Sequence, residues 1–402
     1  MKDIAKYSES SFSKLLYDRF FKNKEGVIAF AILAVILLIV LPMGLSTFRL
    51  NMTGKYLCYA FVALGLVMCW GHAGILSLGQ GMFFGAGGYC MAMFLKLEAS
   101  DPESTAIQST PGIPDFMDWN QVTELPWFWY PFKSLPLTVA LILLLPAVLA
   151  FFMSIFYFKG RVTGVVFAIL TQSMVACMWY FIVGNQGYFG GINGITDLKT
   201  ILGWDIRDES ALRTLYFVCV FLLLGCILLS RYVLSTRLGR VLVAQRDKET
   251  RVRFSGYNIT SFKVFIFCLA AVISSIGGAM FSLQVGFMSP NLVGIQPSID
   301  MVIFTAVGGR ESLLGAVYGA LLVNTAKTAF SEAYPTLWMF LYGATFIAIV
   351  LFLPKGLAGL YHDHVKVWFN KIRSKPKSSA AESEPDSVPT IVELDKEVPD
   401  AK

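Results

Sequence analysis

The chain has 402 residues, of which 55% are hydrophobic and only 15% are charged, and its formal net charge is +6. Soluble globular domains contain about 25% charged residues, so this composition excludes an ordinary soluble protein and favours one that crosses a membrane several times. The basic residues do not gather on one soluble face, which argues against a nucleic-acid-binding protein.

Apolar runs of roughly 20 residues, the length that crosses a bilayer as a helix, recur along the sequence. They predict an all-α integral membrane protein with about ten transmembrane helices, some short or broken, within residues 27–354. The second and eighth runs are short enough to be re-entrant or half-helical. The predicted spans are 27–48, 55–70, 74–97, 136–158, 162–183, 214–233, 263–287, 298–309, 313–330 and 337–353.

The distribution of basic residues predicts which side of the membrane each connection faces. If the N-terminus is cytoplasmic, the cytoplasmic segments hold 25 of the 33 Lys and Arg residues, as the positive-inside rule requires. Ten spans return the C-terminus to the cytoplasm, and the polar composition from about residue 374 predicts disorder. The resulting segments are a cytoplasmic N-terminus 1–26, outer loops 98–135 and 184–213, a cytoplasmic loop 234–262 and a cytoplasmic tail 355–402.

A glycine-rich apolar run lies between residues 66 and 95. Each glycine inside a soluble helix costs about 1 kcal/mol relative to alanine, whereas in a membrane small residues let helix backbones approach closely. The run therefore predicts tight or broken membrane helices, which are typical of a transport pathway. Its glycines are Gly71, Gly74, Gly79, Gly81, Gly85, Gly87 and Gly88.

The cytoplasmic loop 234–262 has the pattern of a short helix over about 238–254. Ser235 or Thr236 can cap its start, and Gly256 can end it in the left-handed conformation. Charges of both signs suit docking onto a soluble protein, although a basic loop that only sets topology has a similar composition. Arg246 and Glu249 are three residues apart and share a helix face. We expect no charge partner for them in the membrane part of the chain.

Motifs for catalysis and for ATP binding do not occur in the sequence, which lacks GxxxxGK[ST], GxSxG, HExxH and CxxC. Carboxylates are nearly absent from the predicted spans, whereas proton-coupled transporters usually need them. Lys327 lies deeper in a span and is expected to reach the outer interface. We therefore expect a chain that is not an enzyme, binds no metal and no cofactor, and takes its energy from another protein.

Three segments together resemble the branched-chain amino-acid (LivM-like) family of ABC importer permeases. They are the glycine-rich segment 71–89, the cytoplasmic loop and Val307-Gly308-Gly309-Arg310. Glu311 departs from the glycine that the family usually has there, and Arg253 adds a charge to the loop. Segments 116–129, 190–199 and 251–258 are similar to the urea-transport (UrtC type) subgroup. The resemblance assigns ATPase coupling to Gly239, Arg240, Ala244, Arg246, Glu249, Arg251 and Gly256.

The resemblance implies a type-II-like importer permease in the bacterial inner membrane, with both termini cytoplasmic. It also implies partners: a homologous second permease, two cytoplasmic ATPase subunits that bind the ATP and Mg²⁺, and an external urea-binding protein. The function expected from it is a pathway for urea. Branched-chain amino acids or short amides are the alternative within the family, and a urea channel or secondary transporter is the alternative outside it.

Urea is small, neutral and planar, with one carbonyl acceptor and four N–H donors. A pathway for it needs uncharged or singly charged hydrogen-bonding groups, because a missed buried hydrogen bond costs roughly 1–3 kcal/mol. Loop residues beside glycines also serve as ordinary turn formers, and a buried glutamine can simply join helices. The candidates are Gln80 in the glycine-rich run and Asn185, Gln186, Asn193, Thr196 and Asp197 in the outer loop.

Overall fold

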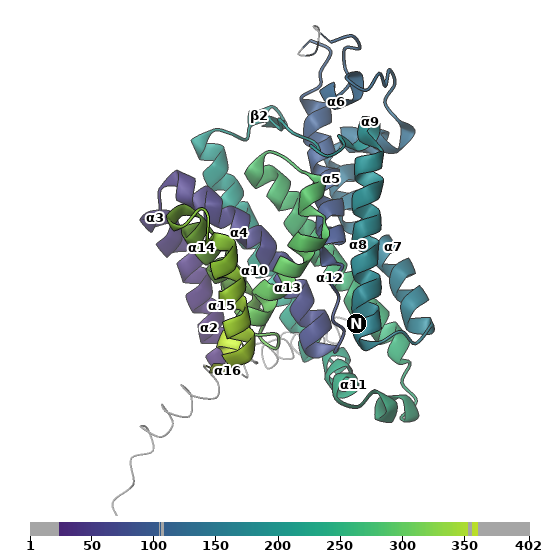
Figure 1. The fold of residues 1–402 in the computed structure, drawn as a ribbon, viewed down its shortest axis with the longest axis vertical. Helices are drawn as coiled ribbons and strands as arrows, with labels where there is room; N and C mark the ends of the chain where they lie inside the picture. Colours follow the sequence, from purple (N-terminus) through teal and green to yellow (C-terminus); the bar gives the residue numbers. More distant parts are fainter. Residues whose placement is uncertain (1–23, 104, 106–107, 353–355, 361–402) are drawn as a thin grey trace, which may run out of the picture. The chain divides into compact units, whose positions relative to one another are not determined.

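Residues 24–103, 105, 108–352 and 356–360 are described by a computed structural model, in which helices dominate (Figure 1). The predicted N-terminal segment lies mostly outside these residues, and the tail beyond 360 lies wholly outside them. Within these described residues, eight helical stretches are long and apolar enough to cross a membrane. The elements before residue 200 are α2 (Lys24–Val35), η1 (Ile36–Val40), α3 (Leu41–Gly44), α4 (Thr47–Leu66), η2 (Val67–His72), α5 (Gln80–Glu98), α6 (Asp115–Asp118), η3 (Trp127–Lys133), α7 (Leu135–Lys159), α8 (Gly164–Gly184) and α9 (Gln186–Phe189).

The second half of the chain adds a two-stranded antiparallel hairpin and the remaining helices. Each of the ten predicted apolar runs contains a helix, although the third, predicted from residue 74, becomes helical only at Gln80. Two of them, α5 and the 15-residue α15, are not among the eight membrane-spanning candidates. The elements are β1 (Thr200–Ile201), β2 (Trp204–Asp205), α10 (Glu209–Ser235), α11 (Arg237–Phe254), α12 (Ile259–Val285), η4 (Pro290–Leu292), α13 (Ile295–Gly308), α14 (Leu313–Ala333), α15 (Trp338–Phe352) and α16 (Gly356–Leu360).

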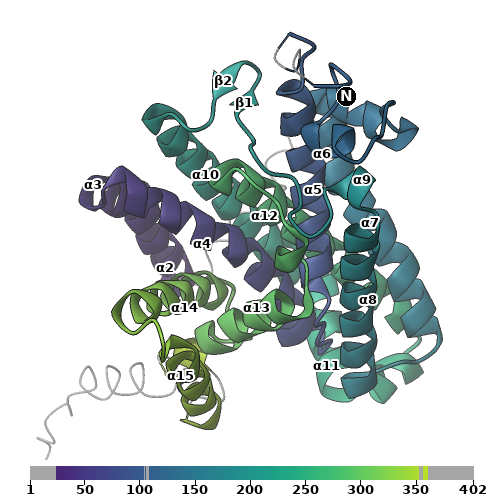
Figure 2. The ribbon, with the colours of Figure 1, turned by 45° about the horizontal axis from the view of Figure 1, so that its top comes forward.

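Three helices, α4, α5 and α12, form the centre of this bundle. In Figures 1 and 2, α7 and α8 lie on one side of them and α14 and α15 lie on the other. In the most apolar 18-residue stretch of each helix, 78% of the residues are buried in α4 and 72% in α12, but only 22% in α7. The outer helices therefore offer their apolar side chains to lipid or to another subunit, as expected where the solvent is a bilayer.

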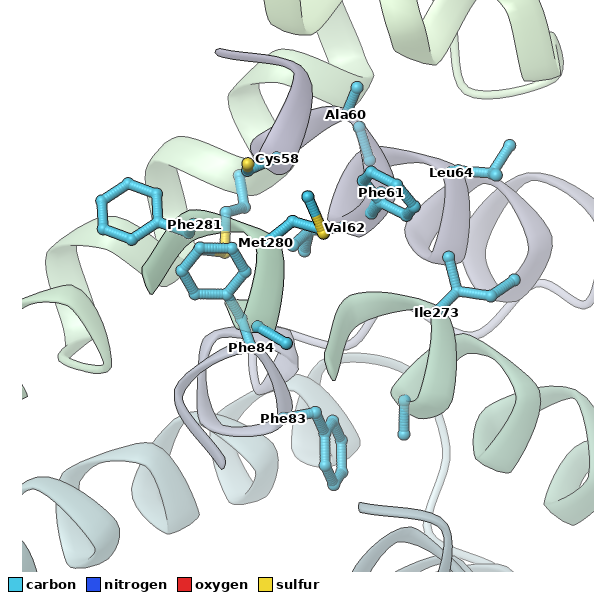
Figure 3. Packing of buried hydrophobic residues seen from close by; sticks show 14 of the residues in the cluster. Cys58, Ala60, Phe61, Val62, Leu64, Phe83, Phe84, Ile273, Met280 and Phe281 are labelled. Atoms are coloured by element: carbon cyan, nitrogen blue, oxygen red, sulfur yellow. The ribbon is translucent and has the colours of Figure 1, made fainter. Parts of the chain in front are cut away.

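Glycines allow the central helices to touch, as the glycine-rich run predicted. A Cβ atom on Gly278 of α12 would lie 1.8 Å from the carbonyl oxygen of Phe84 in α5. A Cβ atom on Gly87 would lie 2.1 Å from the carbonyl oxygen of Ser275. Around this contact the rings of Phe84 and Phe281 pack 5.5 Å apart, centroid to centroid (Figure 3). The predicted break is also present, because residues 73–79 are not helical and α5 begins only at Gln80.

One expectation for a span is wrong, and one side chain has an ion-pair partner that was not expected. The second span is not a short segment from residue 55, since the helix starts at Thr47 and continues to His72 over 26 residues. Ser46 caps it, and Arg49 in its first turns forms an ion pair with Glu332 at 3.1 Å, so polar residues extend the helix beyond the apolar run. Lys327, which was expected to reach the outer interface, forms an ion pair within the bundle: its ammonium lies 2.9 Å from the carboxylate of Asp300 in α13.

Candidate functional site

Helix α11 has the predicted position and the predicted end. Gly256 follows it with a φ of +84°, the left-handed conformation that only glycine adopts readily. The predicted side-chain cap is wrong, because the Thr236 hydroxyl donates a hydrogen bond back to the carbonyl of Val233 and makes none to the new helix. At Lys248 the backbone leaves helical geometry, with φ −148° and ψ 81°. Helix α11 is therefore kinked, and the residues before and after the kink do not keep the spacing of one regular face.

Arg246 and Gln245 tie α11 to the end of α4. The Arg246 guanidinium donates a hydrogen bond to the carbonyl oxygen of Gly71 at 2.6 Å and lies 3.2 Å from the Glu311 carboxylate. The Gln245 amide donates to the carbonyl of Ala73 at 3.4 Å. Helix α11 thus holds both the segment that follows α4 and the turn between α13 and α14.

Glu249 ties α11 to the central helix α12. Its carboxylate lies 2.8 Å from the Lys263 ammonium and 3.1 Å from the Arg253 guanidinium. Lys263 is buried, with a side chain that is 8% exposed, and its ammonium lies 5.7 Å from the centre of the Phe158 ring. The expectation of no charge partner in the membrane part of the chain is therefore wrong for Glu249, because Lys263 belongs to α12. Glu311 is 65 residues from Arg246 and Lys263 is 14 residues from Glu249, so the pattern within α11 did not reveal these two partners.

The three segments that carried the family resemblance meet at this end of the bundle, which we call the α11 end. A Cβ atom on Gly71 would lie 1.7 Å from the carbonyl oxygen of Arg310, so the glycine-rich segment packs directly on the Gly308–Arg310 turn. The Arg310 guanidinium lies 5.7 Å from the centre of the Trp70 ring. A cavity of about 130 Å³ separates α11 from the 73–76 segment and is lined by Gln245, Arg246, Glu249 and Lys263, among others.

The predicted coupling residues therefore divide into three groups. Arg240, Ala244 and Arg251 are exposed, together with Phe254, which is 88% exposed and was not predicted as a site residue. Arg246 and Glu249 face the membrane helices. The two glycines shape the backbone: a Cβ atom on Gly239 would lie 1.9 Å from the Leu234 carbonyl oxygen, and Gly256 forms the turn.

At the opposite end, which carries the loops 99–134 and 185–208 and which we call the loop end, a cavity of about 520 Å³ opens between α4, α10 and α12. Gln284 of α12 lies in its wall and is only 3% exposed, yet neither its amide nitrogen nor its amide oxygen has a hydrogen-bond partner within the described residues. The Asn51 side-chain oxygen in the same wall is also unpaired there. The Gln284 amide lies against Gly54, where a Cβ atom would be 2.7 Å from its oxygen.

Thr196 and Asp197 of the predicted outer loop also line this cavity. The Thr196 carbonyl accepts a hydrogen bond from Lys96 at 3.1 Å. Asp197 forms ion pairs with Lys199, at 2.9 Å, and with Arg207. Burial acts to raise the pKa of Asp197, but the hydrogen bonds and positive charges of Lys199 and Arg207 outweigh it and hold the pKa below its usual value. The carboxylate is therefore engaged by its neighbours.

The remaining pathway candidates lie elsewhere. Asn185 follows the end of α8 and donates to the Phe181 carbonyl at 2.7 Å, and Gln186 opens the short α9 beside it. Asn193 is exposed in a turn and does not line the cavity. Gln80 is buried at the start of α5, where its oxygen accepts a hydrogen bond from the Ser274 hydroxyl at 3.0 Å. Asn51 and Gln284 were missed, although Gln284 is a lone amide within an apolar run and could have been noticed for that reason.

Residues 48–350 match the family described as the permease component of branched-chain amino-acid transport systems. LivM, the high-affinity branched-chain amino-acid permease protein of Salmonella typhimurium, is 23% identical over 371 residues, which cover 86% of this chain and 77% of LivM. The fructose import permease FrcC of Rhizobium meliloti is 30% identical over 161 residues, covering 37% of this chain and 44% of FrcC.

The ribose import permease RbsC of Haemophilus influenzae is 21% identical over 200 residues, which cover 48% of this chain and 60% of RbsC. No solved structure matches the chain. The family match spans most of the residues that form the helices, including both α11 and the α13–α14 turn. The chain therefore belongs to the family of branched-chain amino-acid transport permease components, as a multi-pass membrane subunit that is not itself an enzyme.

Proposed function

We propose that this chain pairs with a homologous permease in the bacterial inner membrane to form the pathway of an ATP-driven urea importer. In this proposal the α11 end faces the cytoplasm and docks two ATPase subunits, which bind the ATP and Mg²⁺. The loop end faces outward and receives urea from an external binding protein. Both chain termini are then cytoplasmic, in agreement with the distribution of basic residues.

The observation that carries the substrate proposal is the unpaired Gln284 amide in the cavity at the loop end. A buried amide without a partner costs about 1–3 kcal/mol, and among the described residues Gln284 is the one side-chain amide whose nitrogen and oxygen are both buried and unpaired. Gln284 offers one donor group and one acceptor, and Asn51 offers a second acceptor. Urea can bond to all of these at once, because it carries four N–H donors and one carbonyl oxygen.

Two observations support the ATP-driven mechanism over a channel. Helix α11 presents the exposed side chains Arg240, Arg251 and Phe254, which mix charge and apolar area as a protein-docking surface does. The same helix is bonded to the membrane helices through Arg246 and Glu249. A channel needs no such connection between a docking surface and its helices. The similarity to LivM keeps branched-chain amino acids as a second candidate class of solute.

The test is uptake of labelled urea by proteoliposomes that contain the complete transporter with its binding protein and ATP. We expect urea uptake to be inhibited by unlabelled urea and weakly by acetamide, and not by leucine. Gln284→Leu should lower urea uptake by at least about tenfold, the effect of losing one buried hydrogen bond in the pathway. Gln296→Leu is the matched control, because Gln296 is exposed and outside the cavity, and it should stay within about twofold of the wild type. Uptake of labelled leucine that urea does not inhibit would overturn the proposal.

A further inference from the structure

Two side chains interrupt the burial of the central helix α4. From Gly54 to Leu66 every residue is buried except Lys55 and Tyr59, which are partly exposed. Asn51, in the wall of the loop-end cavity, precedes Lys55 by four residues, and Tyr59 follows it by four. Residues at this spacing lie on one face of a helix. Asn51, Lys55 and Tyr59 therefore form a stripe that leads from the cavity toward the middle of the bundle.

Lys55 is a charged residue within a membrane-spanning helix. It is eight residues beyond Thr47, about 12 Å along the helix at 1.5 Å per residue. Its ammonium has no ion-pair or hydrogen-bond partner within the described residues and lies 5.9 Å from the centre of the Phe281 ring. Three other lysines on helices of the bundle are paired: Lys96 with Asp115 at 2.8 Å, Lys263 with Glu249 at 2.8 Å and Lys327 with Asp300 at 2.9 Å. An ionised side chain at this depth faces a water-filled cavity or another charged group.

Aromatic rings close the stripe beyond Lys55. The Tyr59 ring lies 5.5 Å from that of Phe84, 5.6 Å from that of Phe281 and 5.8 Å from that of Phe304, measured between centroids. These four residues come from α4, α5, α12 and α13, and Figure 3 shows two of them, Phe84 and Phe281, next to each other. Gln284 is three residues after Phe281 on α12, so the amide and the ring share a face.

The polar groups thus follow one another in a fixed order. The amides of Asn51 and Gln284 line the cavity, the Lys55 ammonium comes next, and the Tyr59 cluster, defined as Tyr59, Phe84, Phe281 and Phe304, follows. An ammonium group has three donors and no acceptor. It can bond to the carbonyl oxygen of a neutral solute, and it repels a cation.

We propose that Lys55 is a solute-contacting residue that receives the carbonyl oxygen of a neutral, planar amide after the solute leaves the cavity, and that the Tyr59 cluster is the closed constriction beyond it. This inference rests on the proposed function for the identity of the amide. It goes further by assigning the residue that distinguishes urea from guanidinium, which has almost the same shape but carries a positive charge.

The first test uses the complete transporter in proteoliposomes. Lys55→Met should lower urea uptake roughly 10- to 100-fold, the effect of losing a hydrogen bond to a charged group. Basal ATP hydrolysis and co-purification of the second permease should be unchanged. In the wild type, guanidinium should not inhibit urea uptake, whereas in Lys55→Glu it should. The matched control is Arg49→Met, in the first turns of the same helix: its ion pair with Glu332 is half exposed and contributes at most about 1 kcal/mol, so uptake should stay within about twofold.

Two results of this experiment would overturn the assignment. Urea uptake by Lys55→Met within twofold of the wild type would show that the ammonium does not contact solute. Loss of the second permease from purified Lys55→Met would show that Lys55 pairs with a carboxylate of that subunit instead.

The second test separates failure of this inference from failure of the urea proposal. In a cysteine-free background, Lys55→Cys and Tyr59→Cys should react with a membrane-impermeant thiol reagent added on the outer side, whereas Leu57→Cys, at a fully buried position, should not. If the wild type transports leucine and not urea, the urea proposal fails, and protection of Lys55→Cys by leucine would still support a pathway along the stripe. If urea is transported and Lys55→Cys stays unreactive at rest and during turnover, the inference alone fails.

Discussion

The two ends of the molecule differ in how far their polar side chains are paired. At the α11 end, the charged side chains that connect helix α11 to the rest of the bundle are paired, Arg246 with Glu311 and Glu249 with Lys263. At the loop end, the amides of Gln284 and Asn51 keep bonding capacity that nothing in the described part of the chain uses. Helices joined by ion pairs can move as one unit, whereas unpaired amides can form hydrogen bonds to a solute. The difference suits force transmission at one end and solute passage at the other.

Reversing the charge of Glu249 should have the largest effect. Glu249→Arg places a cation against the buried Lys263 and Arg253, and breaking a buried pair in this way costs on the order of 3 kcal/mol. We expect loss of solute-stimulated ATP hydrolysis and reduced protein abundance, measured with the reconstituted transporter and by quantitative immunoblot. The exchange of charges in Glu249→Lys with Lys263→Glu should restore most of the hydrolysis. If this double variant is no better than the single ones, the pair does not link α11 to α12.

A substitution at Gly71 tests how closely the glycine-rich segment packs on the Gly308–Arg310 turn. In Gly71→Ala the new Cβ atom would collide with the backbone of Arg310, so we expect a loss of about 1–3 kcal/mol in stability and weaker coupling of ATP hydrolysis to uptake. Gly225→Ala is the control, because nothing lies within 4 Å of the position and alanine is the better helix former. A thermal unfolding midpoint of Gly71→Ala equal to that of Gly225→Ala would contradict the close contact.

The loop end should respond in the opposite way. Gln284→Met replaces an unpaired buried amide by an apolar side chain of similar shape, a change that is neutral or stabilising by about 1 kcal/mol. We expect the thermal unfolding midpoint to stay level or rise while urea uptake falls. A clear loss of stability would mean that Gln284 holds the helices together, and the contrast between the two ends would disappear.

The smallest effect is expected at Asp197. Its pKa lies below the usual value, so its ion pairs with Lys199 and Arg207 contribute fully above the usual carboxyl pKa of about 3.9 and are lost as the pH falls through the lowered pKa. Because the group is exposed, the contribution is at most about 1 kcal/mol. Protection of the 185–208 loop from an acid-active protease should therefore be constant from pH 7 to about pH 4 and decline below that. Asp197→Asn should remove this decline, and an unchanged decline would assign it to another carboxylate.

The positions of the helices could be predicted from the apolar runs, because burial in lipid needs length and hydrophobicity more than any special pattern. The start of α4 could not, since it depends on the Ser46 cap and on the ion pair between Arg49 and Glu332, 283 residues apart. Helix α11 and its glycine turn were also predictable from local signals.

The partners of α11 were not predictable, because Gly71, Lys263 and Glu311 approach it only in the folded chain. Gln284 was missed for a related reason: one glutamine in an apolar run has no local signature. Its significance appears only when its neighbour across the helix contact is known to be Gly54, which has no side chain to bond with it. Sequence could thus locate helix α11 and the loop beside the cavity, but not the amides that open onto the cavity.

The non-helical link 73–79 joins helix α11 to more than one membrane helix. The Ala73 carbonyl accepts a hydrogen bond from Gln245 of α11 at 3.4 Å, and the Leu78 N–H donates to the Thr171 hydroxyl of α8 at 3.1 Å. Seven extended residues can reach about 23 Å, whereas seven helical residues span about 10 Å, so the link could lengthen, but only by giving up one of these bonds. A displacement of α11 is therefore shared with α8 before it reaches α5, whose position is fixed by its glycine contacts with α12.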